Sequence, residues 1–289
     1  MPEFSNLSSL LIFSKQELKK AGIDSFSIDT TLLATKAFDL SREQIIFSPE
    51  ITLNQKQIDY FLKLLTRRIA REPMSHILEK REFFNDSFFV TSAVLDPRPD
   101  SESLIEGIEE VFPNKNSKLN ILELGVGSGC LILTILKIFP NSSGTGIDIS
   151  KEALEIAQKN AKSLDLENKI SFIHSNWFAN IPKNYQFDLI ISNPPYIPSD
   201  DINNLSDEVR IYEPILALDG GKDGLDCYLE IAKNIRNFLK PNGIVVLEIG
   251  QNQEKDVERI FEKHGLKLIQ IKKDLGGIIR CLIFKNENN

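Results

Sequence analysis

The 289-residue chain can bury a large core and has room for one large domain and a small one. Its 41 acidic and 34 basic side chains give a formal net charge of -7, so the surface as a whole repels phosphate backbones. The three cysteines lack metal-ligand spacing, and no apolar run approaches the roughly 20 residues of a membrane span. No secretion signal opens the chain. These features predict a cytoplasmic protein that binds neither a membrane nor, directly, nucleic acid.

Residues 1–80 have the pattern of a small helical domain. Ser14–Glu17 and Thr52–Gln55 match the capping box, in which the first and fourth side chains satisfy free amides, so helices are predicted to begin there. After the second box, apolar residues recur at three- and four-residue spacing, a stripe one helix face wide. Three arginines close this stretch: Arg67, Arg68 and Arg71. They indicate either a solvated face that complements the helix dipole or a docking patch for an acidic partner.

Residues 81–96 change pattern and are predicted to link two domains. Within Arg81–Val90, two pairs of phenylalanines flank Asn85 and Asp86, residue types that tolerate turn conformations. This arrangement predicts a β-hairpin. Because no internal repeat or low-complexity segment is visible, the hairpin is the one domain boundary that the sequence indicates.

Residues 97–289 alternate short apolar runs with helical stretches. The runs are Leu119–Leu124, Gly144–Ile149, Ile170–His174, Phe187–Ser192 and Ile244–Ile249. Helical stretches such as Lys151–Lys162 and Leu225–Leu239 lie between them, which predicts an α/β domain with a parallel sheet covered by helices on both faces. Near the C-terminus, Lys267–Lys272 and Ile278–Phe284 are joined by a short link. Since a short link joins only antiparallel neighbours, the sheet is predicted to end in a hairpin.

The first chemical signal is a glycine loop. The strand Ile121–Leu124 runs into Gly125, Gly127 and Gly129, and a helix follows. Glycines allow a tight turn and close approach of a ligand, and the helix N-terminus offers unpaired amides, so a nucleotide-like ligand is expected. The G-x-G-x-G spacing and the missing Walker lysine disfavour NAD and ATP. Asp148 ends the next strand, where a carboxylate can accept hydrogen bonds from both ribose hydroxyls.

The second signal is Asn193–Tyr196, the tetrapeptide Asn-Pro-Pro-Tyr directly after an apolar strand. Ligands of open α/β sheets bind beyond the carboxyl ends of the strands, so the tetrapeptide should face the same crevice as the glycine loop. Two prolines stiffen the backbone. The Asn193 carboxamide oxygen and the Pro194 carbonyl are then expected to accept hydrogens from an NH2 group, and the Tyr196 ring can stack on a planar amide or base.

These motifs carry a family resemblance. Glu123–Gly129 resembles the S-adenosylmethionine loop of Rossmann-like methyltransferases, and Asn193–Tyr196 resembles their amino-methyltransferase motif. Further matches narrow the family: Pro97–Glu102, Glu213–Pro214, Ala217–Leu218 and Gly220–Leu225. With the helical domain, they resemble the release factor glutamine methyltransferases, which are protein-(glutamine-N5) methyltransferases, over nearly the whole chain.

The resemblance implies transfer of a methyl group from S-adenosyl-L-methionine to the side-chain amide nitrogen of a glutamine, in the Gly-Gly-Gln loop of class 1 peptide chain release factors. Cofactor binding is assigned to Gly125, Val126, Gly127, Ser128, Gly129, Asp148, Trp177 and Asn193. Binding of the glutamine amide is assigned to Asn193, Pro194, Pro195 and Tyr196, and catalysis to Asn193, Pro194 and Tyr196. S-adenosyl-L-homocysteine is the expected product. We expect a monomer whose residues 1–80 recognise the substrate.

No metal is expected, because the sulfonium methyl group is already activated and the amide nitrogen needs mainly to be oriented. Four residues depart from the family's common pattern: Glu79, Phe84, Ser101 and Asn176. In the family, glycine and tryptophan are common in the hairpin region where Glu79 and Phe84 stand. Threonine is usual at Ser101, and an acidic residue is frequent at Asn176.

The sequence leaves three alternatives open. A nucleic-acid adenine amino-methyltransferase shares both motifs but would need a basic surface. A ribosomal-protein glutamine methyltransferase differs mainly in its recognition domain. A non-enzymatic cofactor-binding module would not require an intact Asn193–Tyr196 motif.

Overall fold

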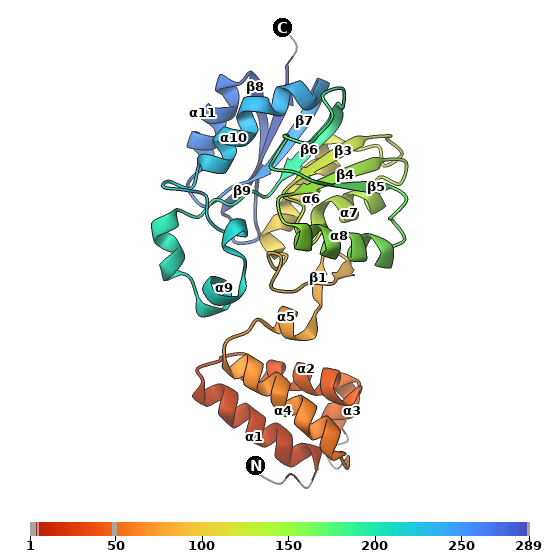
Figure 1. The fold of residues 1–289 in the computed structure, drawn as a ribbon, viewed down its shortest axis with the longest axis vertical. Helices are drawn as coiled ribbons and strands as arrows, with labels where there is room; N and C mark the ends of the chain where they lie inside the picture. The colour runs from red at the N-terminus through yellow and green to blue at the C-terminus, as the bar shows by residue number, and fades with distance from the viewer. Residues whose placement is uncertain (1–3, 5, 48–50, 288–289) are drawn as a thin grey trace. The chain divides into compact units, whose positions relative to one another are not determined.

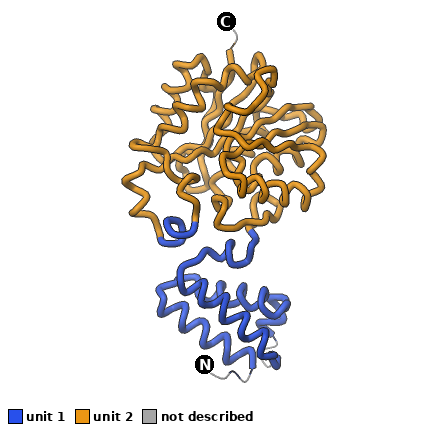
Figure 2. Tube along the Cα trace, viewed as in Figure 1, with its two compact units in different colours: residues 1–80, 207–212 blue, residues 81–206, 213–289 orange. Residues whose placement is uncertain are grey.

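The computed structural model describes residues 4, 6–47 and 51–287. The chain forms two compact units (Figure 2). The first contains residues 1–80 together with 207–212, and the second contains residues 81–206 and 213–289. No helix among the described residues is long and apolar enough to cross a membrane.

Every element in the described part of the first unit is a helix. They are α1 (Leu7–Lys20), α2 (Phe26–Phe38), α3 (Arg42–Phe47), α4 (Gln55–Ile69), α5 (Met74–Leu78) and α9 (Asp207–Tyr212). Their core contains fully buried apolar side chains from α1, α2 and α4, among them Leu10, Leu33 and Phe61. At the end of α5, Glu79 adopts a left-handed φ of 56°, a conformation that glycine adopts without strain.

The two predicted helix starts were misplaced by different amounts. Helix α1 begins at Leu7, where the Asn6 side chain accepts the Ser9 amide, and Ser14 lies inside the helix with its hydroxyl donating to the Leu10 carbonyl. The prediction at Ser14 was wrong because the buried Leu7 and Leu10 extend the apolar face in the N-terminal direction. Helix α4 begins at Gln55 and is capped by Asn54, two positions after the predicted cap Thr52, because the Asn54 side chain accepts the Gln57 amide.

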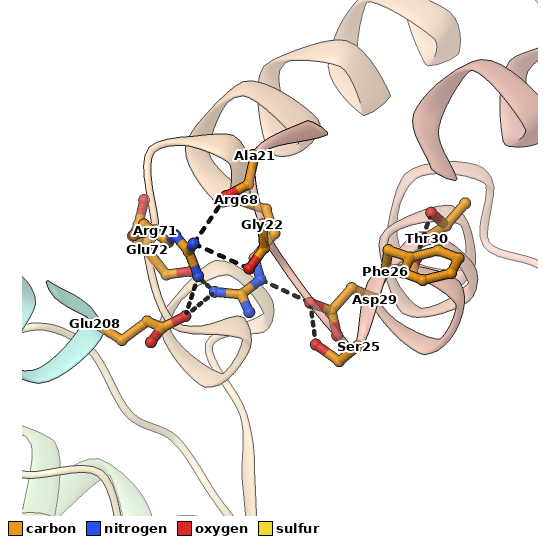
Figure 3. Close-up of polar contacts among 10 residues, drawn as sticks. All are labelled: Ala21, Gly22, Ser25, Phe26, Asp29, Thr30, Arg68, Arg71, Glu72 and Glu208. Atoms are coloured by element: carbon orange, nitrogen blue, oxygen red, sulfur yellow. Dashed lines mark hydrogen bonds and ion pairs between the residues drawn. The ribbon is translucent and has the colours of Figure 1, made fainter. Parts of the chain in front are cut away.

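The arginines at the end of α4 find their acidic partners in the same unit (Figure 3). Arg68 is buried, and its Nε donates to Asp29 of α2 at 2.7 Å while its Nη1 donates to Glu208 of α9 at 3.2 Å. Arg71 donates to the carbonyls of Ala21 and Gly22. Arg68 is therefore neither a solvated cation nor a free docking group: it ties α9 to α2 and α4.

The second unit is organised around a seven-stranded sheet (Figure 1). Its strands are β3 (Asn120–Leu124), β4 (Ser143–Asp148), β5 (Ile170–His174), β6 (Phe187–Ser192), β7 (Leu239–Glu248), β8 (Leu266–Lys273) and β9 (Ile279–Asn286). The order is β5-β4-β3-β6-β7-β9-β8, with the first five parallel and β9 antiparallel to both β7 and β8. The predicted parallel sheet with a C-terminal antiparallel hairpin is thus confirmed.

Helices cover both faces of this sheet (Figure 1). One face packs against α6 (Glu102–Val111), α7 (Cys130–Ile138) and α8 (Lys151–Ser163), and the other against α10 (Asp226–Ile235) and α11 (Glu254–Lys263). Successive strand residues point to opposite faces, so Ile121 joins the first layer and Leu122 the second. Short 3-10 turns complete the unit: η1 (Pro99–Ser101), η2 (Ser199–Asn204), η3 (Ile215–Ala217) and η4 (Arg236–Phe238).

A β-hairpin forms over the predicted residues, with β1 (Arg81–Phe83) antiparallel to β2 (Asp86–Phe88). Phe83 and Phe88 are buried in the layer between the sheet and α6 and α7, so the hairpin is part of the second unit's core. Phe84 adopts a left-handed φ of 56° in the turn, and its amide donates to the Glu102 carboxylate at 2.9 Å.

Candidate active site

A cavity of about 390 Å³ lies within the second unit, at the carboxyl ends of β3, β4 and β6. Its volume falls within the range of small-ligand sites. Of the predicted residues, its wall includes Gly125, Val126, Gly127, Ser128, Asp148, Trp177, Asn193 and Pro195. Gly129, Pro194 and Tyr196 lie next to these residues but do not line it. The two sequence motifs therefore face one cavity because parallel strands end at the same edge of a sheet.

The glycine loop between β3 and α7 has three left-handed positions, with φ of 71° at Gly125, 51° at Gly127 and 80° at Gly129. Side chains adopt this region rarely, which explains the glycines. The Val126 amide donates to the Ile147 carbonyl at 2.8 Å, holding the loop against β4. A Cβ added at Gly125 or Gly127 would meet no atom within 4 Å, so the loop is a cradle open to the cavity rather than a packed turn.

Asp148 at the end of β4 is held in place by backbone amides. Its Oδ2 accepts the Gly127 amide and its Oδ1 accepts the Ser150 amide, each at 2.9 Å. Burial raises the pKa of this carboxyl, and these two amide hydrogen bonds counter the rise. Because a carboxylate offers about four acceptor positions, Asp148 can accept further hydrogen bonds from a diol in the cavity.

Trp177 follows β5 and contributes half-buried aromatic surface to the cavity. Trp177 packs against the buried cluster on the sheet face that α10 and α11 cover. The backbone turns sharply there, with φ of 46°, and the Ser175 hydroxyl donates to the Trp177 carbonyl at 2.7 Å. The ring provides a flat apolar wall suited to an adenine-like group.

The Asn193–Tyr196 tetrapeptide forms a rigid ledge after β6, supported from behind by a glycine-rich segment, residues 220–224. The Gly220 amide donates to the Ile197 carbonyl at 2.9 Å. A Cβ at Gly220 would lie 2.8 Å from Tyr196 Cα, and one at Gly224 would lie 2.3 Å from the Tyr196 carbonyl oxygen. The glycines are therefore required by close backbone approach, which explains why this segment accompanies the ledge.

Tyr196 does not line the cavity, and its side chain bonds a buried acid instead. Its hydroxyl donates to Glu248 Oε1 at 3.3 Å, and burial raises the pKa of the phenol. Glu248 ends β7 and is almost fully buried. Ser101 of η1 donates to its other oxygen, Oε2, at 2.5 Å, and Asn193 Nδ2 donates to Ser101 Oγ at 3.3 Å. Burial, the largest influence, raises the pKa of Glu248 to about 7.

Sequence reasoning gave no individual role to three acidic residues near the cavity, although Glu123 and Glu213 belong to the motifs that carry the resemblance. Glu248 supports the ledge, Glu123 lines the cavity and accepts the Ile132 amide at 3.1 Å, and Glu213 accepts from Arg98 at 2.6 Å. Burial raises the pKa of Glu213 to about 7. The available signal was a carboxylate inside an apolar strand: Glu123 and Glu248 both interrupt runs of buried aliphatic residues.

The sheet order, the glycine cradle and the ledge together define a class of protein, the Rossmann-like methyltransferases. Comparison with known proteins agrees: residues 115–275 match the family model described as "Methyltransferase domain", and residues 9–78 match "PrmC N-terminal domain". A methyltransferase of known structure from Pyrococcus furiosus, 20% identical, aligns with a TM-score of 0.51 over 78% of this chain and 96% of that one, which shows the fold alone.

Relatives identify the family. The release factor glutamine methyltransferase of Caulobacter vibrioides is 42% identical over 262 residues, which cover 91% of this chain and 90% of that protein. The bifunctional methyltransferase of Rickettsia conorii is 36% identical over 98% of this chain, which spans 58% of that longer protein. The chain belongs to the release factor glutamine methyltransferase family, and the resemblance predicted from the motifs is confirmed.

Proposed function

We propose that this protein transfers a methyl group from S-adenosyl-L-methionine to the side-chain amide nitrogen of a glutamine in class 1 peptide chain release factors. The observation that carries the proposal is the opening of two motifs onto one cavity, a nucleoside cradle at Gly125–Gly129 and an amide-accepting ledge at Asn193–Tyr196. The similarity to release factor glutamine methyltransferases along nearly the whole chain supports the substrate.

The cavity residues fit the cofactor. The open cradle at Gly125 and Gly127 leaves room for the methionine part and the sugar, Asp148 retains acceptor capacity for the ribose hydroxyls, and Trp177 offers a flat surface for adenine. When bound, S-adenosyl-L-methionine supplies a methyl group activated by the sulfonium charge and leaves as S-adenosyl-L-homocysteine. The protein then needs to orient the amide nitrogen, for which no metal is required.

The ledge orients the substrate amide. Among the described residues, the Asn193 Oδ1 and the Pro194 carbonyl oxygen accept no hydrogen bond from the protein, so both can accept one from the substrate NH2 group. An amide nitrogen is a poor nucleophile because its lone pair is delocalised into the carbonyl. Accepting both of its hydrogens favours rehybridisation and stabilises the positive charge that develops as the methyl group is transferred.

The helical residues 1–80 contain none of the cavity residues, and we propose that they recognise the release factor. Their match to the N-terminal domain model of the same family supports this role. We further propose that the protein acts as a cytoplasmic monomer without direct nucleic-acid contact, since its formal net charge of -7 disfavours phosphate backbones.

One labelling experiment tests the proposed substrate. The protein is incubated with methyl-labelled S-adenosyl-L-methionine and, in separate reactions, a release factor, ribosomal proteins or adenine-containing DNA, and peptide mass spectrometry locates the label. We expect label on one glutamine of the release factor. A release factor with that glutamine replaced by asparagine is the matched control. Label on ribosomal protein or DNA, with none on the release factor, would contradict the proposal.

A further inference from the structure

Both ends of the ledge converge on one buried acid. Glu248 is 1% exposed, accepts the Tyr196 hydroxyl on Oε1 and accepts the Ser101 hydroxyl on Oε2. Ser101, itself 3% exposed, in turn accepts Asn193 Nδ2. A continuous chain of hydrogen bonds thus runs from the end of β7 through η1 to the carboxamide that faces the cavity.

This chain of hydrogen bonds has a direction because a serine hydroxyl carries a single hydrogen. An ionised carboxylate only accepts, so Ser101 must donate to Glu248, and Ser101 Oγ is left to accept from the NH2 of Asn193. The carboxamide oxygen of Asn193 then makes no hydrogen bond with Ser101, and it remains available to accept one from the substrate. A protonated Glu248 could donate to Ser101, which would then donate to the Asn193 oxygen and turn the NH2 toward the substrate.

We propose that Glu248 is a positioning residue: its ionised carboxylate, acting through Ser101, sets which end of the Asn193 carboxamide faces the substrate amide. The inference rests on the proposed role of Asn193 as an acceptor. In the turned state the Asn193 NH2 would oppose the substrate NH2, two donors without an acceptor, so methyl transfer requires the ionised form.

The groups around Glu248 set the pH at which its carboxyl gains or loses a proton. Burial, the largest influence, raises the pKa of Glu248, and the Asp100 carboxylate raises it further, whereas the Ser101 hydrogen bond, Arg280 and the Tyr196 hydrogen bond lower it. The other titratable groups facing it are Tyr196 on the ledge, Tyr228 of α10, Cys281 of β9 and Cys130 of α7. Burial raises the pKa of each of these four, so they stay neutral near pH 7. Glu248 is therefore the group of this cluster that titrates near pH 7.

The test measures single-turnover methyl transfer from pH 5.5 to 8.5, at saturating cofactor and release factor. We expect the methyl-transfer rate of the parent protein to fall as the pH decreases below about 7, with the loss approaching tenfold for each pH unit. This fall is the acid limb of the pH profile. Glu248→Gln should lower the rate about 10- to 100-fold at pH 8 and abolish this acid limb, because its amide cannot ionise. Ser101→Thr, which keeps the hydroxyl, should retain the parent rate and profile, and Ser101→Ala should resemble Glu248→Gln.

Glu213→Gln is the matched control, because Glu213 is another buried acid with a pKa raised to about 7 but bonds Arg98 rather than the ledge. This variant should keep the acid limb. Cofactor affinity, measured by calorimetry, should change less than threefold in all variants, which excludes general unfolding. A Glu248→Gln protein that keeps the acid limb, or the parent rate at pH 8, would overturn the proposal. Parent-like transfer by Asn193→Ala would instead refute the acceptor role on which it rests.

Discussion

At the scale of single residues, Asn193 is the side chain on which the chemistry depends most. Its Nδ2 is used by Ser101, so its oxygen is the atom left for the substrate amide as the nitrogen becomes positive. That bond strengthens in the transition state, so Asn193→Ala should lower turnover by about 100- to 1000-fold, as loss of an oxyanion-hole donor does. Cofactor affinity should fall less. Single-turnover kinetics at saturation measure the effect, and transfer at the parent rate would refute it.

Asp148 tests the cofactor assignment. Asp148→Ala removes a carboxylate that we expect to accept both ribose hydroxyls, so S-adenosyl-L-methionine should bind more weakly by about 1 to 3 kcal/mol. Isothermal titration calorimetry gives the difference directly. Glu155→Ala, which removes an exposed acid from α8, serves as the control and should leave the affinity unchanged. Equal affinity in both variants would mean that Asp148 does not hold the ribose.

At the scale of elements, the buried arginine of α4 holds the first unit together. Asp29→Ala leaves Arg68 buried without its closest partner, which should destabilise this unit by about 3 to 5 kcal/mol. Glu17→Ala removes an exposed ion pair with Lys20 and should cost under about 1 kcal/mol.

Chemical denaturation followed by two probes can separate this effect from the rest of the chain. Far-ultraviolet circular dichroism reports the helices of both units, whereas the fluorescence of Trp177, the one tryptophan of the chain, reports the second unit alone, so a shift seen by dichroism and not by fluorescence belongs to the first unit. If Asp29→Ala shifted the dichroism transition no more than Glu17→Ala does, Arg68 would not have the structural role inferred from its burial.

The glycine-rich support of the ledge makes a second prediction at this scale. Gly224→Ala adds a Cβ that would lie 2.3 Å from the Tyr196 carbonyl at a φ of 76°, so both strain and a clash with the ledge are expected. Gly277→Ala adds the same strain, at φ of 82°, where the Cβ would meet nothing within 4 Å. Because of the clash, Gly224→Ala should lower the free energy of unfolding by about 1 to 3 kcal/mol more than Gly277→Ala does.

The two glycine variants should also differ in catalysis. Gly224→Ala should raise the KM for the release factor and lower turnover while cofactor affinity is kept, because the displaced residue belongs to the ledge and not to the cradle. Gly277→Ala should act like the parent protein. Equal kinetics in the two variants would show that the ledge tolerates displacement.

At the scale of the whole molecule, the division into two units predicts a division of labour. A fragment of residues 81–289 retains every wall of the cavity and the hairpin phenylalanines Phe83 and Phe88, which are buried in the second unit. It should bind S-adenosyl-L-methionine like the parent protein. It should methylate an intact release factor poorly, because the proposed recognition unit is missing. Circular dichroism must show that the fragment is folded, and full activity on the intact substrate would contradict the recognition role.

Much of the fold and of the candidate site could be predicted from short-range patterns in the sequence. The apolar strands, the glycine loop at Gly125–Gly129, Asp148 and the Asn193–Tyr196 ledge depend on short-range patterns, and parallel strands necessarily bring their carboxyl ends to one edge. The α/β fold with its C-terminal hairpin was therefore predicted correctly. Helix starts were predicted less accurately, because the buried Leu7 and Leu10 extend α1 toward the N-terminus, well before the cap predicted at Ser14.

Contacts between distant residues were decided only by the tertiary structure. Arg68 and Glu208 are far apart in the sequence, as are Ser101 and Glu248, and no spacing rule relates the members of either pair. Their partnerships arise because burial removes water as an alternative partner, so each buried polar group must find a hydrogen bond from whatever the fold brings near. The sequence by itself determined which residues form the cradle and the ledge, and packing decided which buried acid supports the ledge.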